Sequence, residues 1–109
     1  MISPIEEATI RYSADIRDTV AYQEYRRLLD MIKLEPQLFA KVNEYRMKNF
    51  RLQTMEPIDG LLEKMECLER EYEAITDNQL ANDFLRAELG FCRLMQDINK
   101  CISLELEFE

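Results

Sequence analysis

The residues of this chain best suited to metal or redox chemistry are three cysteines, Cys67, Cys92 and Cys101. They form no Cys-x-x-Cys pair, and Cys92 and Cys101 are too far apart to share one metal ion on a single helix. An iron–sulfur or metal cluster would therefore need ligands from other chains. The odd count argues against a disulfide framework, so we expect reduced thiols buried on helices.

Acid–base chemistry finds little support in the sequence. The chain has 22 acidic residues but no histidine, which removes the usual general base and the Ser–His and Cys–His nucleophile pairs. Carboxylate di-iron bundles need Glu-x-x-His motifs, and a phosphate-binding glycine loop is also missing. We therefore predict no catalytic, metal or cofactor site and a protein that is not an enzyme. A metal-dependent enzyme assembled across subunits stays an alternative.

One short stretch of the chain is basic. It carries one acid, Glu44, and two interleaved aromatic residues, against four cations: Lys41, Arg46, Lys48 and Arg51. The functional interpretation is a patch that binds RNA or a protein partner. The structural interpretation, which we favour, is a hairpin in which this basic helix faces the acidic helix that follows. The net charge of −8 disfavours direct binding to nucleic acid.

These residues must be positioned by helices, because apolar residues recur at helical spacing along the chain. Ser3-Pro4-Ile5-Glu6 is typical of a helix start, with Ile5, Thr9, Tyr12 and Ile16 on one face behind it. We predict a single all-α domain over 1–109, an antiparallel bundle of four or five helices with coiled-coil-like packing and a long C-terminal helix. The expected helices are 4–17, 19–33, 36–54, 57–75 and 78–103. The segment 104–109 alternates apolar and acidic residues, which is the period of a strand. We expect it to fray, and a short extended segment that pairs with another edge is the alternative.

The last helix has the most regular pattern, a heptad seam. A second apolar stripe adjoins this seam, so the apolar face is wider than one neighbouring helix would cover. We therefore expect at least two neighbours, one of them from another chain. Two roles stay open for Glu88: pairing with a cation across the interface, or simple exposure. The predicted oligomer interface consists of Leu80, Phe84, Ala87, Glu88, Phe91, Leu94 and Ile98.

No apolar run is long enough to span a membrane, and the N-terminal residues do not have the pattern of a signal peptide. We therefore expect a cytoplasmic protein with no membrane partner.

A family resemblance extends these expectations. The run 77–98, DNQLANDFLRAELGFCRLMQDI, resembles the C-terminal helix of the YlbF/YmcA family of small bacterial regulators. The matching positions include Phe84, Ala87, Glu88, Leu94 and Ile98. The stretch 22–52 is similar to the family's second and third helices, including an acidic-proline turn.

The resemblance implies an all-helical regulatory adaptor that self-associates and acts through protein contacts. The partners that it implies are sibling family proteins and RNase Y, with effects on messenger-RNA processing, competence, sporulation and biofilm formation. Family complexes can carry iron–sulfur clusters through a cysteine-rich extension that this sequence lacks, so we expect no cofactor. The alternatives are an RNA-contacting protein that uses residues 41–51 and a structural oligomerisation module.

Overall fold

The structure is a computed structural model that describes residues 2–54 and 60–107. This part of the chain is all-α, as the sequence predicts, and contains six helices where four or five were expected. Their bounds are α1 Pro4–Arg17, α2 Val20–Lys33, α3 Pro36–Thr54, α4 Leu61–Glu71, α5 Glu73–Thr76 and α6 Gln79–Glu105.

Side-chain caps begin three of the helices. The Ser3 hydroxyl accepts a hydrogen bond from the Glu6 amide at α1, and the Thr19 hydroxyl accepts one from the Tyr22 amide at α2, each at 3.2 Å. The side-chain oxygen Oδ1 of Asn78 accepts a hydrogen bond from the Ala81 amide at 3.0 Å, at the start of α6. Each cap satisfies a backbone donor that the first turn leaves free. These short polar residues explain why the predicted helix starts agree with the structure.

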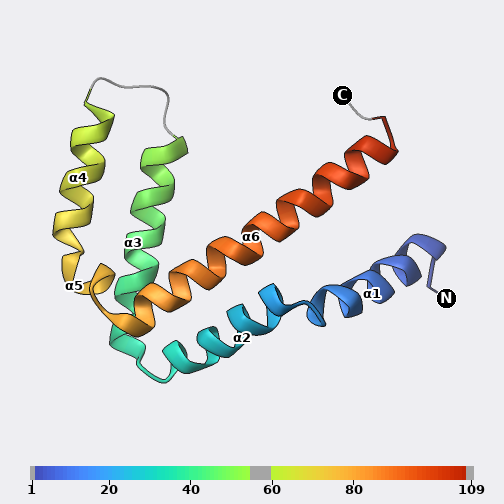
Figure 1. The fold of residues 1–109 in the computed structure, drawn as a ribbon, viewed down its shortest axis with the longest axis horizontal. Helices are drawn as coiled ribbons and strands as arrows, with labels where there is room; N and C mark the ends of the chain where they lie inside the picture. The colour runs from blue at the N-terminus through green and yellow to red at the C-terminus, as the bar shows by residue number, and fades with distance from the viewer. Residues whose placement is uncertain (1, 55–59, 108–109) are drawn as a thin grey trace.

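The core lies at one end of the molecule, where α2, α3, α4, α5 and α6 meet (Figure 1). Phe84, Ile32 and Val42 are its largest fully buried side chains. The Phe84 ring stacks on Tyr25 of α2 at 5.9 Å and meets Phe39 of α3 edge-on at 6.3 Å. The N-terminal half of α6 is therefore held between α2 and α3.

The predicted helix 57–75 is divided in the structure. Residues 57–59 lie outside the described part of the chain, and α4 ends at Glu71, immediately before Tyr72. Tyr72 has φ −111° and ψ 26°, is buried, and meets Tyr45 edge-on at 5.6 Å. This packing redirects the chain into the short helix α5. The heptad steps of the sequence continue across the break and so did not reveal it.

The molecule has an open, elongated shape. Figure 1 shows α3 and α4 as an upright hairpin, whereas α6 and the succession α2–α1 extend from the core to the opposite end. The radius of gyration is 17.5 Å, against about 13 Å for a compact domain of this length. Helix α1 has no buried residue. The bundle is therefore well packed at one end and open at the other.

Candidate interaction surfaces

A broad hollow on the described surface is a groove between α1 and the C-terminal half of α6, which we call the α1–α6 groove. Its volume is about 950 Å³. No Cα atoms of the two helices approach within 8 Å of each other, although α2 contacts α6 extensively. The apolar and sulfur-bearing side chains that line it are Ile5, Tyr12, Ile16, Met95, Ile98, Cys101 and Ile102.

The groove continues a face of α6 that is covered nearer the core. Phe91 stacks on Tyr25 at 5.4 Å and meets Tyr22 edge-on at 5.5 Å, so α2 covers α6 up to this level. Met95, Ile98 and Ile102 follow Phe91 at steps of four, three and four residues, which places them on the same helical face. The chain breaks its helix at Asp18 and Thr19, and beyond this break no Cα atom of α1 lies within 8 Å of a Cα atom of α6. The groove is therefore an apolar face that has lost its covering helix.

The predicted interface residues divide into two groups. Phe84 is fully buried, and Leu80 and Ala87 pack against the same core, so this chain's own helices cover all three. Phe91 is half-buried against α2. Leu94 and Ile98 lie further along α6, and Ile98 lines the α1–α6 groove. The self-association interface itself stays a prediction, and its uncovered part lies toward the C-terminal half of α6.

Glu88 has a third role that neither interpretation of the sequence included. Its Oε2 atom is buried and forms an ion pair with Nη2 of Arg46, from α3 of the same chain. The Arg46 guanidinium also lies over the Phe84 ring, 5.5 Å from its centroid. Burial raises the pKa of the Glu88 carboxyl, and the attraction of Arg46 offsets only part of that rise. The pair therefore joins α3 to α6 at the edge of the core.

The predicted basic patch is largely occupied by acids of the same chain. Lys41 pairs with Glu44 at 3.3 Å within α3. Lys48 reaches across to Glu71 of α4 at 3.0 Å, as the favoured interpretation of a charge-complementary hairpin expects. With Arg46 held by Glu88, three of the four cations have partners. Arg51 is exposed near the end of α3, at the rim of a second groove.

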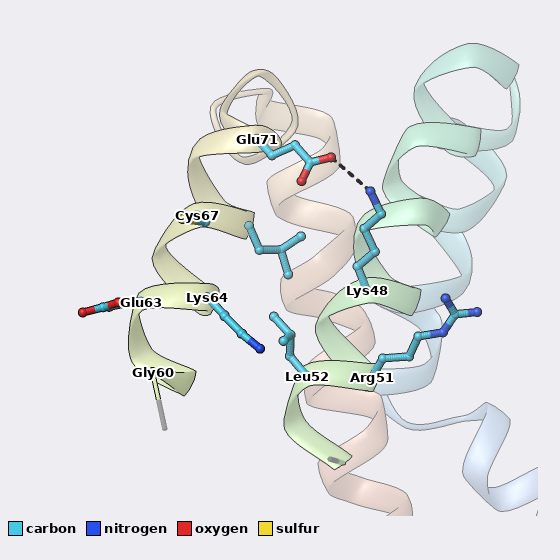
Figure 2. Close-up of a pocket in the computed structure, with 9 residues that line it drawn as sticks. Lys48, Arg51, Leu52, Gly60, Glu63, Lys64, Cys67 and Glu71 are labelled. Carbon is cyan, nitrogen blue, oxygen red and sulfur yellow. Dashed lines mark hydrogen bonds and ion pairs between the residues drawn. The ribbon is translucent and has the colours of Figure 1, made fainter. Parts of the chain in front are cut away.

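That second groove, the α3–α4 groove, lies between the two helices of the hairpin and has a volume of about 600 Å³. Leu52 and Leu68 contribute apolar surface between the helices. Figure 2 shows Lys64 pointing toward Leu52, whereas Glu63 and Arg51 point away from the space between the helices. The Lys48–Glu71 pair closes one end. The arrangement offers a mixed apolar and cationic surface to a partner.

All three cysteines are exposed, so the prediction of buried thiols was wrong. Cys67 precedes the buried Leu68, and Cys92 follows the half-buried Phe91. Both cysteines are themselves turned outward. Cys101 lies on the heptad seam, but at a level where no helix of this chain covers it. The sequence pattern identified the apolar face but not where its cover ends.

Within the described residues, no group of three or more histidine, cysteine, aspartate or glutamate side chains is placed to hold a metal ion. Among the helices described, none is long and apolar enough to cross a membrane.

Comparison with known proteins places the chain in a family. The family profile described as "Control of competence regulator ComK, YlbF/YmcA" matches residues 5–107. This chain belongs to the YlbF/YmcA family. The family is a regulatory one by that description, which supports a role in the control of competence. The resemblance drawn from α6 and from residues 22–52 is thereby confirmed.

The curated relatives share about a quarter of their aligned residues with this chain, and their printed names state no function. A UPF0342 protein of Lacticaseibacillus casei (strain BL23) is 24% identical over 93 residues, which cover 84% of this chain and 82% of the relative. One from Desulfitobacterium hafniense (strain Y51) is 24% identical over 100 residues, covering 90% of this chain and 81% of the relative. No solved structure gives a significant match.

Proposed function

We propose that this protein is a non-enzymatic regulatory adaptor that acts in the cytoplasm through contacts with other proteins. Its partners under this proposal are sibling YlbF/YmcA proteins and RNase Y, so that it modulates messenger-RNA processing in competence, sporulation and biofilm formation. The observation that carries the proposal is a chain of a regulatory family with an apolar groove between α1 and α6 and a groove of mixed apolar and charged lining between α3 and α4. Such surfaces are typical of protein–protein interaction sites.

The two grooves suggest a division of roles. The α1–α6 groove continues the heptad seam, and it supports self-association through the C-terminal half of α6. The α3–α4 groove lies at the other end of the molecule. The two hairpin helices also expose Met47, Phe50 and Leu62, which are not among the residues that line the groove. An adaptor that self-associates needs one surface for contact with its own copies and another for its partner. We assign the α3–α4 hairpin to the partner.

The alternative of an RNA-contacting protein has weaker support. Acidic residues engage Lys41, Arg46 and Lys48, and the chain carries a net charge of −8. Binding to a phosphate backbone would need free cations that release counterions. A structural oligomerisation module would share the α1–α6 groove but would not need the hairpin surface.

A pull-down from the native host tests the proposal. The tagged protein is recovered from lysate with and without nuclease, and its companions are identified by mass spectrometry. We expect RNase Y or sibling family proteins to remain bound after nuclease treatment. A Phe50→Asp/Leu62→Asp variant, altered at 68% and 71% exposed side chains of the hairpin, should lose them. A matched Val20→Asp variant, 82% exposed on α2, should retain them. Loss of every companion on nuclease treatment would favour the RNA alternative.

A further inference from the structure

The α3–α4 groove combines an apolar floor with a cation that points into it. Leu68 is buried and Leu52 is half-buried where the two helices meet. Figure 2 shows the Lys64 side chain directed from α4 toward Leu52 of α3. A lysine stem can lie along apolar surface while its ammonium group stays accessible to water or to a partner. The groove therefore presents a positive charge directly beside apolar contacts.

The charged side chains around the groove are unevenly engaged. Lys48 is held by Glu71 at 3.0 Å, whereas no ion pair among the described residues includes Arg51 or Lys64. The other acid of the lining, Glu63, points away from the space between the helices (Figure 2). The whole chain carries a net charge of −8, so the groove is a local excess of positive charge on an acidic protein. It attracts an acidic partner and the rest of the surface does not.

The shape of the groove suits one additional helix. Its α4 wall extends from Gly60 to Glu71. Helix α4 has 11 residues, which corresponds to about 16 Å, or three turns. A helix laid along two others packs its side chains between theirs and satisfies its own backbone hydrogen bonds. The described residues form no strand, so this part of the chain offers no sheet edge on which an extended segment could pair.

We propose that the α3–α4 groove binds an amphipathic helix of a partner protein, about three turns long, with acidic side chains beside its apolar stripe. The apolar stripe contacts Leu52 and Leu68. Carboxylates of the partner helix pair with Lys64 inside the groove and with Arg51 at its rim. This assignment rests on the proposed adaptor function for the identity of the partner, and it adds the chemistry that the partner must present to the hairpin.

The lining of the groove favours a protein helix over a nucleic acid. A phosphate backbone is bound by several free cations at once, and single-stranded bases stack on aromatic side chains. The lining residues include no aromatic side chain, and Glu71 already engages one of the three cations. The leucine side chains of the floor match the apolar side of a helix instead.

The first test measures the binding of synthetic peptides to the purified full chain by fluorescence anisotropy. The acidic peptide has a leucine stripe flanked by glutamates, and a hydrocarbon staple keeps it helical, because short peptides are marginal helices in water. The basic peptide has lysine in place of every glutamate, and the polar peptide has glutamine in place of every leucine. We expect the acidic peptide to bind most tightly, and its advantage over the basic peptide should shrink at high salt, which screens exposed charges. Failure of the acidic peptide to bind, or binding of either control peptide as tightly, would overturn the proposal.

Charge reversal locates the binding site in the groove. Arg51→Glu/Lys64→Glu should weaken binding of the acidic peptide by about tenfold, because two attractive contacts become repulsive. The same variant should bind the basic peptide more tightly than the wild type does, a gain that an unfolded chain would not show. Arg70→Glu is the matched control, an exposed cation of α4 outside the lining, and should bind as the wild type does. Equal weakening by the two variants would mean that the peptide responds to net charge and not to the groove, and would overturn the proposal.

Two further measurements address other occupants of the groove. A single-stranded RNA oligonucleotide should not displace the acidic peptide from the wild type, and displacement would assign the groove to RNA. Light scattering should give the same mass for the wild type and for Arg51→Glu/Lys64→Glu. A lower mass for the variant would assign the groove to a second copy of this chain. Either of these results would overturn the proposal of a partner helix.

The docking site and the adaptor function fail in different ways. In the pull-down from lysate, Arg51→Glu/Lys64→Glu should lose the companions that the wild type and Arg70→Glu retain. A double variant that keeps every companion would refute the groove as the docking site and leave the adaptor function intact. A wild type that selects the acidic peptide but recovers no companion would remove the adaptor function and keep the binding chemistry of the groove.

Discussion

Arg46 of α3 and Glu88 of α6 form an ion pair directly beside the buried ring of Phe84. The two residues come from helices far apart in the sequence, and the pair fixes how α3 crosses the N-terminal half of α6. The Arg46 side chain is 34% exposed and that of Glu88 is 21% exposed, so water screens the attraction only in part. Burial of the Glu88 carboxyl raises its pKa, whereas the attraction of Arg46 lowers it, so the two effects oppose each other.

This opposition predicts a pH dependence. Because burial raises the pKa of Glu88, the folded chain holds this proton more strongly than the unfolded chain does. The contribution of Glu88 to stability is therefore fully present below the ordinary carboxyl value of 4.5 and is lost as pH rises through the raised pKa. A Glu88→Gln variant lacks this titration.

The measurement is urea unfolding of both proteins between pH 4 and pH 7. The wild type should lose stability relative to Glu88→Gln as pH increases over this interval. Glu44→Gln, altered at an exposed acid in an ion pair within α3, serves as the control and should show no such trend. A relative change in the opposite direction would mean that the Arg46 attraction outweighs burial.

The core makes a second prediction. Phe84→Ala should lower the free energy of unfolding by about 3–5 kcal/mol, because it leaves a cavity between Tyr25 and Phe39 and removes the surface on which Arg46 lies. Phe50→Ala removes the same side chain at a 68% exposed position, and its effect should stay within about 0.5 kcal/mol. Equal losses for the two variants would contradict the assignment of Phe84 to the core of the single chain.

The sequence predicted those features that local chemistry determines. Ser3, Thr19 and Asn78 begin helices in the structure because a short polar side chain there caps the first turn. The regular seam of α6 correctly indicated a long C-terminal helix, although its buried residues lie only in its N-terminal half. All-α architecture followed from this periodicity, and the family resemblance followed from the same packing positions.

The features that the sequence did not reveal depend on contacts between distant segments. The partner of Glu88 lies on α3, and no spacing within α6 points to it. The break at Tyr72 arises from packing on Tyr45, across the hairpin. The exposure of Cys101 follows from the divergence of α1 from α6. The periodicity showed which face is apolar, but not which helix covers it.

The third prediction concerns the Asn78 cap at the N-terminus of α6. Asn78→Ala should reduce stability by about 1 kcal/mol, because the Ala81 amide would lose its acceptor at the start of the longest described helix. Asn78→Asp, which keeps an acceptor oxygen and suits the positive end of the helix dipole, should retain most of it. Thermal unfolding followed by circular dichroism measures both. An alanine variant as stable as the wild type would show that the first turn does not need this cap.

Gly90 offers a stabilising change that also bears on the proposed self-association. It lies in the middle of α6 and is exposed, and a Cβ atom there would meet nothing within 4 Å. Gly90→Ala should therefore raise the free energy of unfolding by about 0.5–1 kcal/mol through helix propensity and a less flexible unfolded chain. The position borders the apolar seam of α6, between Ala87 and Leu94, but the space around it has room for a methyl group, so the mass in solution should not change. A loss of stability together with a lower mass in solution would mean that another helix crosses α6 closely at Gly90.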